Sequence, residues 1–194
     1  MLMKWIKCQV NEENKRSFSK AQERWGELRH CSGFMGQIGG WNRNELYEAG
    51  ILSIWKDLQS YQSFMQNQHD EIFGKSDQGS TYTNISVDIH EKIFNIGTTD
   101  MTAFFCKGKL LRVADCSVEN DKKAGFEQVK RNIWNKGMTP GMLSGAIGKG
   151  QSGRYLAASL WDNEYSHQRY VDKELAALIR EAGVIELHPK WAVI

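Results

Sequence analysis

Polar and apolar residues alternate in some parts of this chain and follow a helical period in others. Residues 4–10 alternate, which predicts a half-buried strand. Residues 11–28 begin with acidic side chains and then carry apolar residues three and four positions apart, which predicts an amphipathic helix. Alternation returns at about 33–40 and 46–55, where two further strands are expected.

A second helix is predicted after Trp55, where Asp57 can cap its first turn. The apolar residues of its expected inner face are Leu58, Tyr61, Phe64 and Met65. A final strand is expected at 84–94, so the first half of the chain has the order strand, helix, strand, strand, helix, strand.

The second half of the chain predicts the same order of elements. Its strands are expected at 109–118, 141–149, 153–161 and 184–193, with helices that begin near Glu119 and after Trp161. Asp162 is the expected cap of the last helix. The segment 96–107 between the halves is expected to form a short linker helix or an extra strand.

The two halves also match residue by residue. Shifts of 108, 109, 106 and 98 positions place Cys8 on Cys116, Trp25 on Trp134, Trp55 on Trp161 and His90 on His188. The shift changes in the polar, glycine-containing stretches 40–48 and 74–84, where surface loops tolerate insertions. The chain is therefore interpreted as a tandem duplication.

Each copy has the element order of the split βαβ, or ferredoxin-like, unit. Helices cover one face of such a sheet, so its other face needs a second layer, which a second copy can supply. The expected fold class is α+β, with two tandem ferredoxin-like βαββαβ units whose antiparallel sheets pack as an intramolecular pseudo-dimeric α/β barrel. The expected domains are a first repeat at 1–95, a linker at 96–108 and a second repeat at 109–194.

Composition and charge narrow the classes of partner. The net charge is +2 and no basic run occurs, so nucleic acid is not an expected partner. No apolar run reaches the roughly 18 residues of a membrane span, and the N-terminus lacks a signal-peptide pattern. The four cysteines form no CxxC pair and have no zinc-ligand spacing with histidine, which predicts free thiols, no metal site and a cytoplasmic location.

Several aromatic and histidine residues are candidates for a site. Trp55 and Trp161 each end a strand, and each is either a core anchor or a stacking wall for a planar ligand. His69 lies late in the expected helix, as a general base or as a solvated helix-end histidine favoured by the helix dipole. Its neighbours Asp70 and Glu71 are expected to point elsewhere.

The second copy offers different chemistry from the first. His167 and Tyr170 are three positions apart on one helix face, as an acid/base pair or as a surface contact. His90 and His188 occupy matching places, and a polar outer strand face explains them more simply than a metal pair. Because the matched residues serve the fold, chemistry is expected where the copies differ.

The chain resembles the dimeric α/β-barrel superfamily, and within it the branch of antibiotic-biosynthesis-monooxygenase-like proteins. The resemblance is carried by residues 54–69 and 160–170, in which a Trp closes the third strand and a helix with aromatic residues and a His follows. The order of elements matches over nearly the whole chain. The chain is most similar to an uncharacterised Bacillus-type branch with two fused copies.

The resemblance implies a pocket between the sheet and the helices of each copy. His69, His167 and Tyr170 are then the candidate catalytic residues, and the candidate ligand-binding residues are Trp55, Tyr61, Phe64 and Trp161. The implied function is a cofactor-independent monooxygenase that acts on a small aromatic or quinol-like substrate. The alternatives are a non-catalytic protein that binds a small hydrophobic or aromatic ligand, or has a stress-related role, and a haem-binding or haem-degrading protein.

The two copies lead to two further expectations. The haem-degrading relatives use an Asn on the first strand, which this chain lacks in both copies, so haem degradation fits less well.

A chain that contains its own second copy is expected to be a monomer that forms a pseudo-dimer, or else a homodimer.

Overall fold

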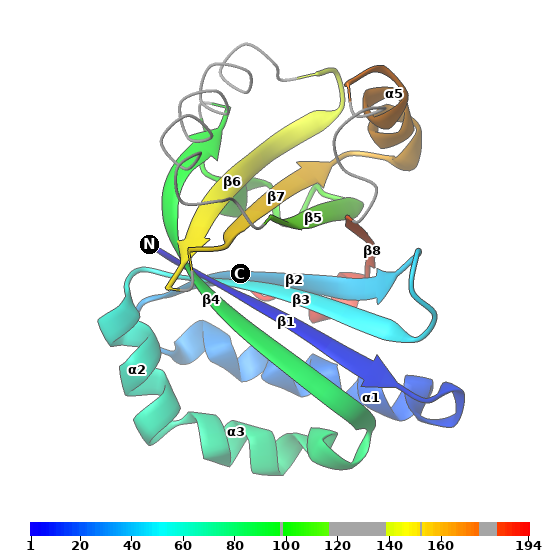
Figure 1. Cartoon of the computed structure of the whole chain (residues 1–194). Coiled ribbons are helices and arrows are strands. Elements are labelled where there is room, and N and C mark those ends of the chain that lie inside the picture. The colour runs from blue at the N-terminus through cyan, green and yellow to red at the C-terminus, as the bar shows by residue number, and fades with distance from the viewer. Residues whose placement is uncertain (98, 117–138, 152, 175–181) are drawn as a thin grey trace. The chain divides into compact units, whose positions relative to one another are not determined.

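The computed structural model describes all residues of the chain except 98, 117–138, 152 and 175–181 (Figure 1). The chain forms two compact units. The first contains residues 1–89 together with 185–194, and the second contains residues 90–184. Among the described helices, none combines the length and the apolar composition needed to cross a bilayer.

The first unit is built on antiparallel strands. They are β1 (Leu2–Val10), β2 (Phe34–Asn42), β3 (Glu48–Trp55) and the first part of β4 (Tyr82–Ile96). β3 pairs with β1 on one side and with β2 on the other. This register places Lys4 opposite Ser53 and Ser53 opposite Gln37, so the three side chains point to one face of the sheet.

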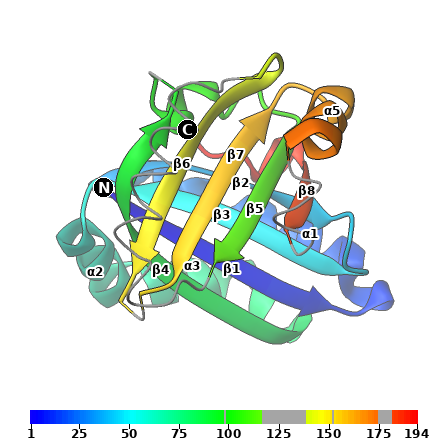
Figure 2. The same ribbon diagram turned by 45° about the horizontal axis from the view of Figure 1, so that its top comes forward.

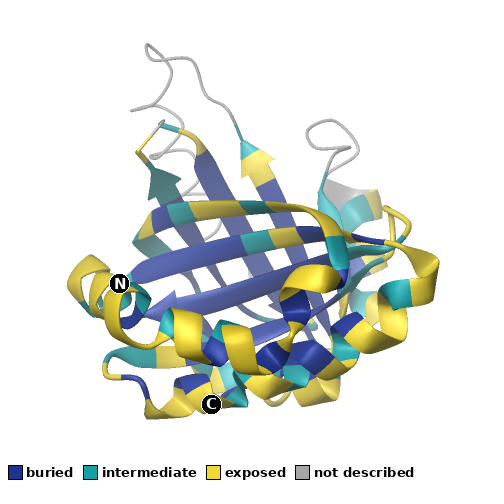
Figure 3. Cartoon of the chain, turned by 90° about the horizontal axis from the view of Figure 1, so that it is seen from below, coloured by how far each residue is buried: buried dark blue, intermediate teal, exposed yellow. Residues whose placement is uncertain are grey.

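Helices cover one face of this sheet (Figure 1). They are α1 (Lys15–Glu23), a 3₁₀ continuation (Arg24–His30), α2 (Leu58–Asn67) and α3 (His69–Ser76). Figure 3 shows that the buried residues of the helices lie toward the strands and the exposed residues toward solvent. The expected inner face of α2 is correct at Phe64, whereas Leu58 is exposed.

The cap of α2 is the expected one. The Asp57 carboxylate accepts a hydrogen bond from the Ser60 amide at 2.7 Å, and the Ser60 hydroxyl donates to the same oxygen. In the second unit, Asn163 and not Asp162 plays this part, since its side-chain oxygen accepts from the Ser166 amide at 2.9 Å. The cap residue directly precedes the first helical residue, which is Glu164, and Asp162 is one position too early.

The second unit repeats the strands of the first. They are β5 (Leu110–Cys116), β6 (Met142–Gly150) and β7 (Tyr155–Trp161), with helix α5 (Glu164–Glu174) after β7. β7 lies between β5 and β6, as Figure 2 shows. The helix expected from Glu119 lies outside the described residues. The segment between the halves contains a short 3₁₀ helix, Met101–Phe104, rather than a strand.

The last strand of each repeat pairs with the second strand of the other repeat. In the first unit, β8 (Gly183–Leu187) pairs with β2 over Gly40–Asn42. In the second unit, the end of β4 pairs with β6 from His90 to Ile96. β8 is shorter than expected because Pro189, which has no amide proton, begins a 3₁₀ turn. Each compact unit therefore contains a strand segment from the other repeat.

In each repeat, a glycine directly before the second strand lies close to a serine in the first turn of the second helix. Gly33 has φ +76°, and a Cβ there would lie 2.3 Å from the Ser60 hydroxyl oxygen. Gly141 has φ +94° and meets Ser166 in the same way. A side chain at either position would meet a steric clash and an unfavourable backbone conformation.

We expect Gly33→Ala to lower the free energy of unfolding by about 2 kcal/mol, because it combines a left-handed backbone with this clash. The matched control is Gly74→Ala in helix α3, where an added Cβ meets nothing within 4 Å. That change should be neutral or should stabilise the protein by about 0.5–1 kcal/mol. Urea unfolding measures both variants, and equal effects would contradict the expectation.

Candidate functional site

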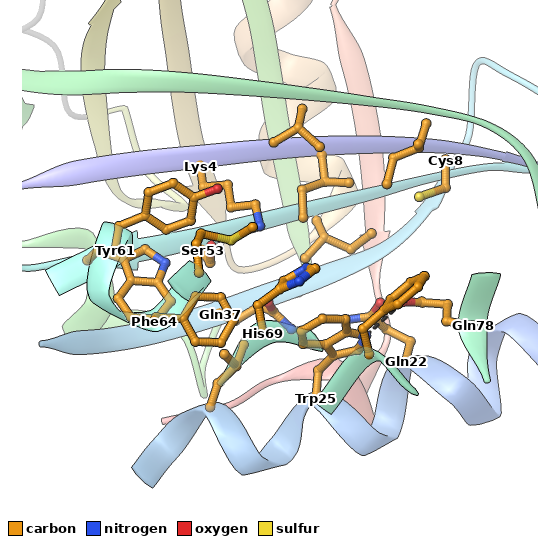
Figure 4. Close-up of a pocket in the computed structure, with 18 of the residues that line it drawn as sticks. Lys4, Cys8, Gln22, Trp25, Gln37, Ser53, Tyr61, Phe64, His69 and Gln78 are labelled. Atoms are coloured by element: carbon orange, nitrogen blue, oxygen red, sulfur yellow. Dashed lines mark hydrogen bonds between the residues drawn. The ribbon is translucent and has the colours of Figure 1, made fainter. Parts of the chain in front are cut away.

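A cavity of about 400 Å³ lies in the first unit between the sheet and its helices (Figure 4). Its floor carries Lys4, Gln37 and Ser53 from three neighbouring strands, and its walls come from α2, α3 and the 3₁₀ segment that follows α1. This volume lies within the usual range for small-ligand pockets. All of its lining residues belong to the first unit.

Aromatic rings form one wall of the cavity. Trp55 closes β3, and its ring centroid lies 4.8 Å from that of Phe64 and 5.8 Å from that of Tyr61. Tyr61 and Phe64 are three positions apart on α2, so both rings face the sheet. The structure thus places the candidates Trp55, Tyr61 and Phe64 together at one wall, where a flat apolar ligand could stack.

His69 also lines this cavity, but its setting differs from the sequence expectation. The expected helix breaks at Gln68, so His69 begins α3 instead of ending a helix. The dipole argument for a helix C-terminus therefore does not apply. The expectation that Asp70 points elsewhere is also wrong, because its carboxylate lies 2.8 Å from His69 Nδ1.

The environment of His69 suits a general base. An ionised carboxylate only accepts, so in the neutral imidazole Nδ1 carries the proton toward Asp70 and Nε2 has the lone pair. The imidazole stacks on Phe73 at 5.8 Å, with Trp25 and Phe64 both at 5.7 Å. Asp70 itself is almost fully exposed, so it orients the ring more than it stabilises charge.

Lys4 is the cation of the cavity, and our sequence reasoning missed it. Its side chain is 8% exposed, and Nζ lies 5.2 Å from the centre of the Tyr61 ring. Burial lowers the pKa of Lys4 to about 8. A sequence signal existed, because Lys4 precedes Ile6 and Cys8 by two and four positions and must therefore share their apolar strand face.

Gln37 and Ser53 continue a polar row from Lys4 across the floor. Gln37 is 3% exposed, and its Nε2 has no hydrogen-bond partner among the described residues. A buried amide without an acceptor is unfavourable, so a ligand oxygen near Gln37 would stabilise the site. At the far end of the cavity the side-chain amide of Gln78 has hydrogen-bond partners. Its oxygen accepts from Trp25 Nε1 at 2.7 Å, and its Nε2 donates to the Gln22 side-chain oxygen at 2.8 Å.

Two titratable neighbours stay protonated and uncharged. Burial, with a smaller contribution from Glu48, raises the pKa of the Cys8 thiol to about 12, so Cys8 is no nucleophile at neutral pH. Burial also raises the pKa of Tyr61, whose hydroxyl can therefore donate a hydrogen bond to a ligand.

The remaining candidates, Trp161, His167 and Tyr170, lie in the second unit and do not line this cavity. Trp161 is fully buried, with the His167 ring 5.3 Å and the Tyr170 ring 5.1 Å from its own. They occupy the places that Trp55, Tyr61 and Phe64 have in the first unit. The structure therefore brings the candidates together as two separate groups, one in each unit.

The matched histidines differ from their expectation. His90 is 4% exposed, so the expected polar outer strand face is wrong there. His188 stacks on Trp191, with ring centroids 5.2 Å apart. In the described part of the chain, no three His, Cys, Asp or Glu side chains are grouped as a metal site requires.

We expect Lys4→Met to raise the free energy of unfolding by roughly 2–3 kcal/mol at pH 7, because the variant no longer buries an ammonium group. Between about pH 8 and 10.5 the unfolded chain binds a proton that folded Lys4 has lost. The free energy of unfolding of the unchanged protein therefore rises with pH through this window. Its difference from the free energy of unfolding of Lys4→Met becomes smaller.

Denaturant unfolding at pH 7 and pH 10 measures this difference. Lys7→Met is the matched control, because Lys7 is exposed on the same strand. If the difference in free energy of unfolding between Lys4→Met and the unchanged protein is the same at pH 7 and pH 10, the pKa of Lys4 is not lowered. That result would contradict the expectation.

Known proteins resemble this chain in sequence and in fold. Residues 2–90 match a family described as a domain of unknown function, DUF4937. The uncharacterised protein YdbC of Bacillus subtilis (strain 168) is 39% identical over 94 residues, which are 47% of this chain and 79% of that protein. That relative is therefore little longer than one repeat.

Two solved structures resemble the chain over 96% of its length and 91% of their own. One is a candidate monooxygenase from Fusobacterium nucleatum subsp. nucleatum, with a TM-score of 0.74 and 13% identity. The other is an anthrone oxidase-like protein, with a TM-score of 0.71 and 10% identity. Similarity at this level of identity shows the fold, which is α+β with two tandem ferredoxin-like units. The chain belongs to the family of YdbC of Bacillus subtilis.

Proposed function

We propose that the cavity of the first unit belongs to a cofactor-independent monooxygenase that acts on a small aromatic, quinol-like substrate. The observation that carries the proposal is Lys4, a buried ammonium group at the floor of an aromatic-walled cavity that also contains His69. The similarity to a candidate monooxygenase and to an anthrone oxidase-like protein supports the same reaction class by analogy of fold.

The residues fit a reaction that begins with proton removal. His69 Nε2 accepts a proton from an acidic hydroxyl or from a carbon next to a carbonyl group. The Lys4 ammonium group stabilises the anion that forms, and its effect is strong because the apolar surroundings weaken competition from water. Trp55 and Phe64 hold the ring of the substrate in place.

Molecular oxygen then oxidises the substrate anion. For an anthrone-like substrate, the ring CH2 group becomes C=O, so one atom of O2 enters the product. The second oxygen atom leaves as water together with the two hydrogens of the CH2 group. The substrate supplies both pairs of electrons, and no further reductant is required.

We expect purified protein to consume oxygen with anthrone or 1,4-dihydroxynaphthalene faster than buffer does. His69→Gln should lower kcat by about 100-fold or more, because it removes the base. Lys4→Met should lower kcat/KM, whereas Lys7→Met should leave it unchanged. An oxygen electrode measures the rates, and thermal unfolding confirms that each variant is folded.

Two results would contradict this function. If neither substrate raises oxygen uptake above the rate in buffer, the protein does not have the proposed activity. If a substrate binds in the cavity without oxygen uptake, and Lys4→Met abolishes that binding, the protein is a non-catalytic ligand-binding protein.

A further inference from the structure

The second repeat carries its own buried cation at the place that corresponds to Lys4. A shift of 108 positions places Lys4 on Arg112. The pairing agrees, because Lys4 lies opposite Ser53 in the first unit and Arg112 lies opposite Ser159 in the second. Both repeats therefore place a basic side chain opposite a serine, two positions from the Trp that closes the neighbouring strand.

Arg112 is buried and incompletely satisfied. Its side chain is 6% exposed, and Nη2 has no hydrogen-bond partner among the described residues. Burial lowers the pKa of Arg112, but a guanidinium group stays charged at neutral pH. A buried guanidinium group with a donor left over is unfavourable, so an anion beside it would stabilise the fold.

Aromatic side chains share this face of the second unit. Leu110, two positions from Arg112, lies opposite Trp161, so Arg112 and Trp161 point to the same side of the sheet. Trp161 contacts the rings of His167 and Tyr170. Trp161 Nε1 donates to the Ser159 hydroxyl oxygen at 3.0 Å, which leaves the hydroxyl proton of Ser159 to donate onward.

We propose that the second unit contains a binding site for an aromatic carboxylate, with Arg112 as the residue that binds the carboxylate group. This site goes beyond the function proposed for the first unit and does not depend on it. A guanidinium group presents parallel N–H donors that match the two oxygens of a carboxylate. Ser159 adds a hydroxyl donor, and the partly exposed ring of Tyr170, which packs on Trp161, provides a surface for the ligand ring.

The change from lysine to arginine separates the two sites chemically. An ammonium group acts as a point charge and suits a phenolate or enolate oxygen, whereas a guanidinium group suits a planar anion with two oxygens. Inorganic phosphate shares the guanidinium geometry but has no ring to stack on the aromatic side chains. The aromatic surroundings therefore favour an aryl carboxylate over phosphate.

The test is isothermal titration of the full-length chain with benzoate, its neutral analogue benzamide and inorganic phosphate. The titrations use Lys4→Met protein, so that the cation of the first unit does not contribute. We expect one benzoate to bind per chain at least about tenfold more tightly than benzamide or phosphate. The additional change Arg112→Met should abolish benzoate binding, and Arg169→Met, at an exposed arginine on α5, should not.

Three outcomes would overturn the proposal. They are equal affinity for benzoate and benzamide, tighter binding of phosphate than of benzoate, and benzoate binding that persists in Arg112→Met. Oxygen uptake by the first unit is a separate measurement, so failure of either proposal leaves the other intact.

Thermal unfolding without ligand separates a ligand-binding arginine from a structural one. If Arg112 awaits an anion, Arg112→Met removes an incompletely paired charge and raises Tm. If a carboxylate of the chain pairs with Arg112, the same variant lowers Tm, and the proposal is wrong. Arg169→Met serves again as the control and should leave Tm nearly unchanged.

Discussion

The packing of one tryptophan between sheet and helix sets the geometry of each unit. Trp55 closes β3, lies in register with Leu2 and Phe34 on the flanking strands, and packs against Phe64 of α2. A fully buried indole keeps the helix and the sheet apart by the thickness of its ring. Farther along the sheet, where β1 carries Lys4, that separation is what leaves room for a cavity.

The second unit uses the same construction with Trp161. This residue closes β7 in register with Leu110 and Met142 and contacts His167 and Tyr170 of α5. The glycine before the second strand and the serine in the first turn of the following helix are also retained. Duplication has therefore preserved the residues that fix backbone geometry, while other inward-facing side chains have changed from Lys4 to Arg112 and from Tyr61 to His167.

Both proposed sites place polar groups where the fold alone would favour apolar ones. Lys4, Ser53 and Gln37 form a polar row on a largely apolar sheet face, and Arg112 lies on the same sheet face as Trp161. Such groups destabilise the empty protein, and the surrounding aromatic clusters must offset that effect. A ligand that provides the matching oxygen atoms then stabilises the fold as it binds. At the two proposed sites, ligand binding and the cost of burying these polar groups would thus have the same physical origin.

The sequence by itself determined the repeat, the order of the elements and the aromatic wall. Those features depend on the spacing of apolar residues along the chain and on the match between the two halves. The spacing of Trp55, Tyr61 and Phe64 was enough to place them on one wall. The tertiary structure decided the rest. The break at Gln68 turns His69 toward the cavity, and the register of β1, β3 and β2 aligns Lys4, Ser53 and Gln37 in one row. Strand register and a helix break depend on packing between segments far apart in the chain, which no local pattern records.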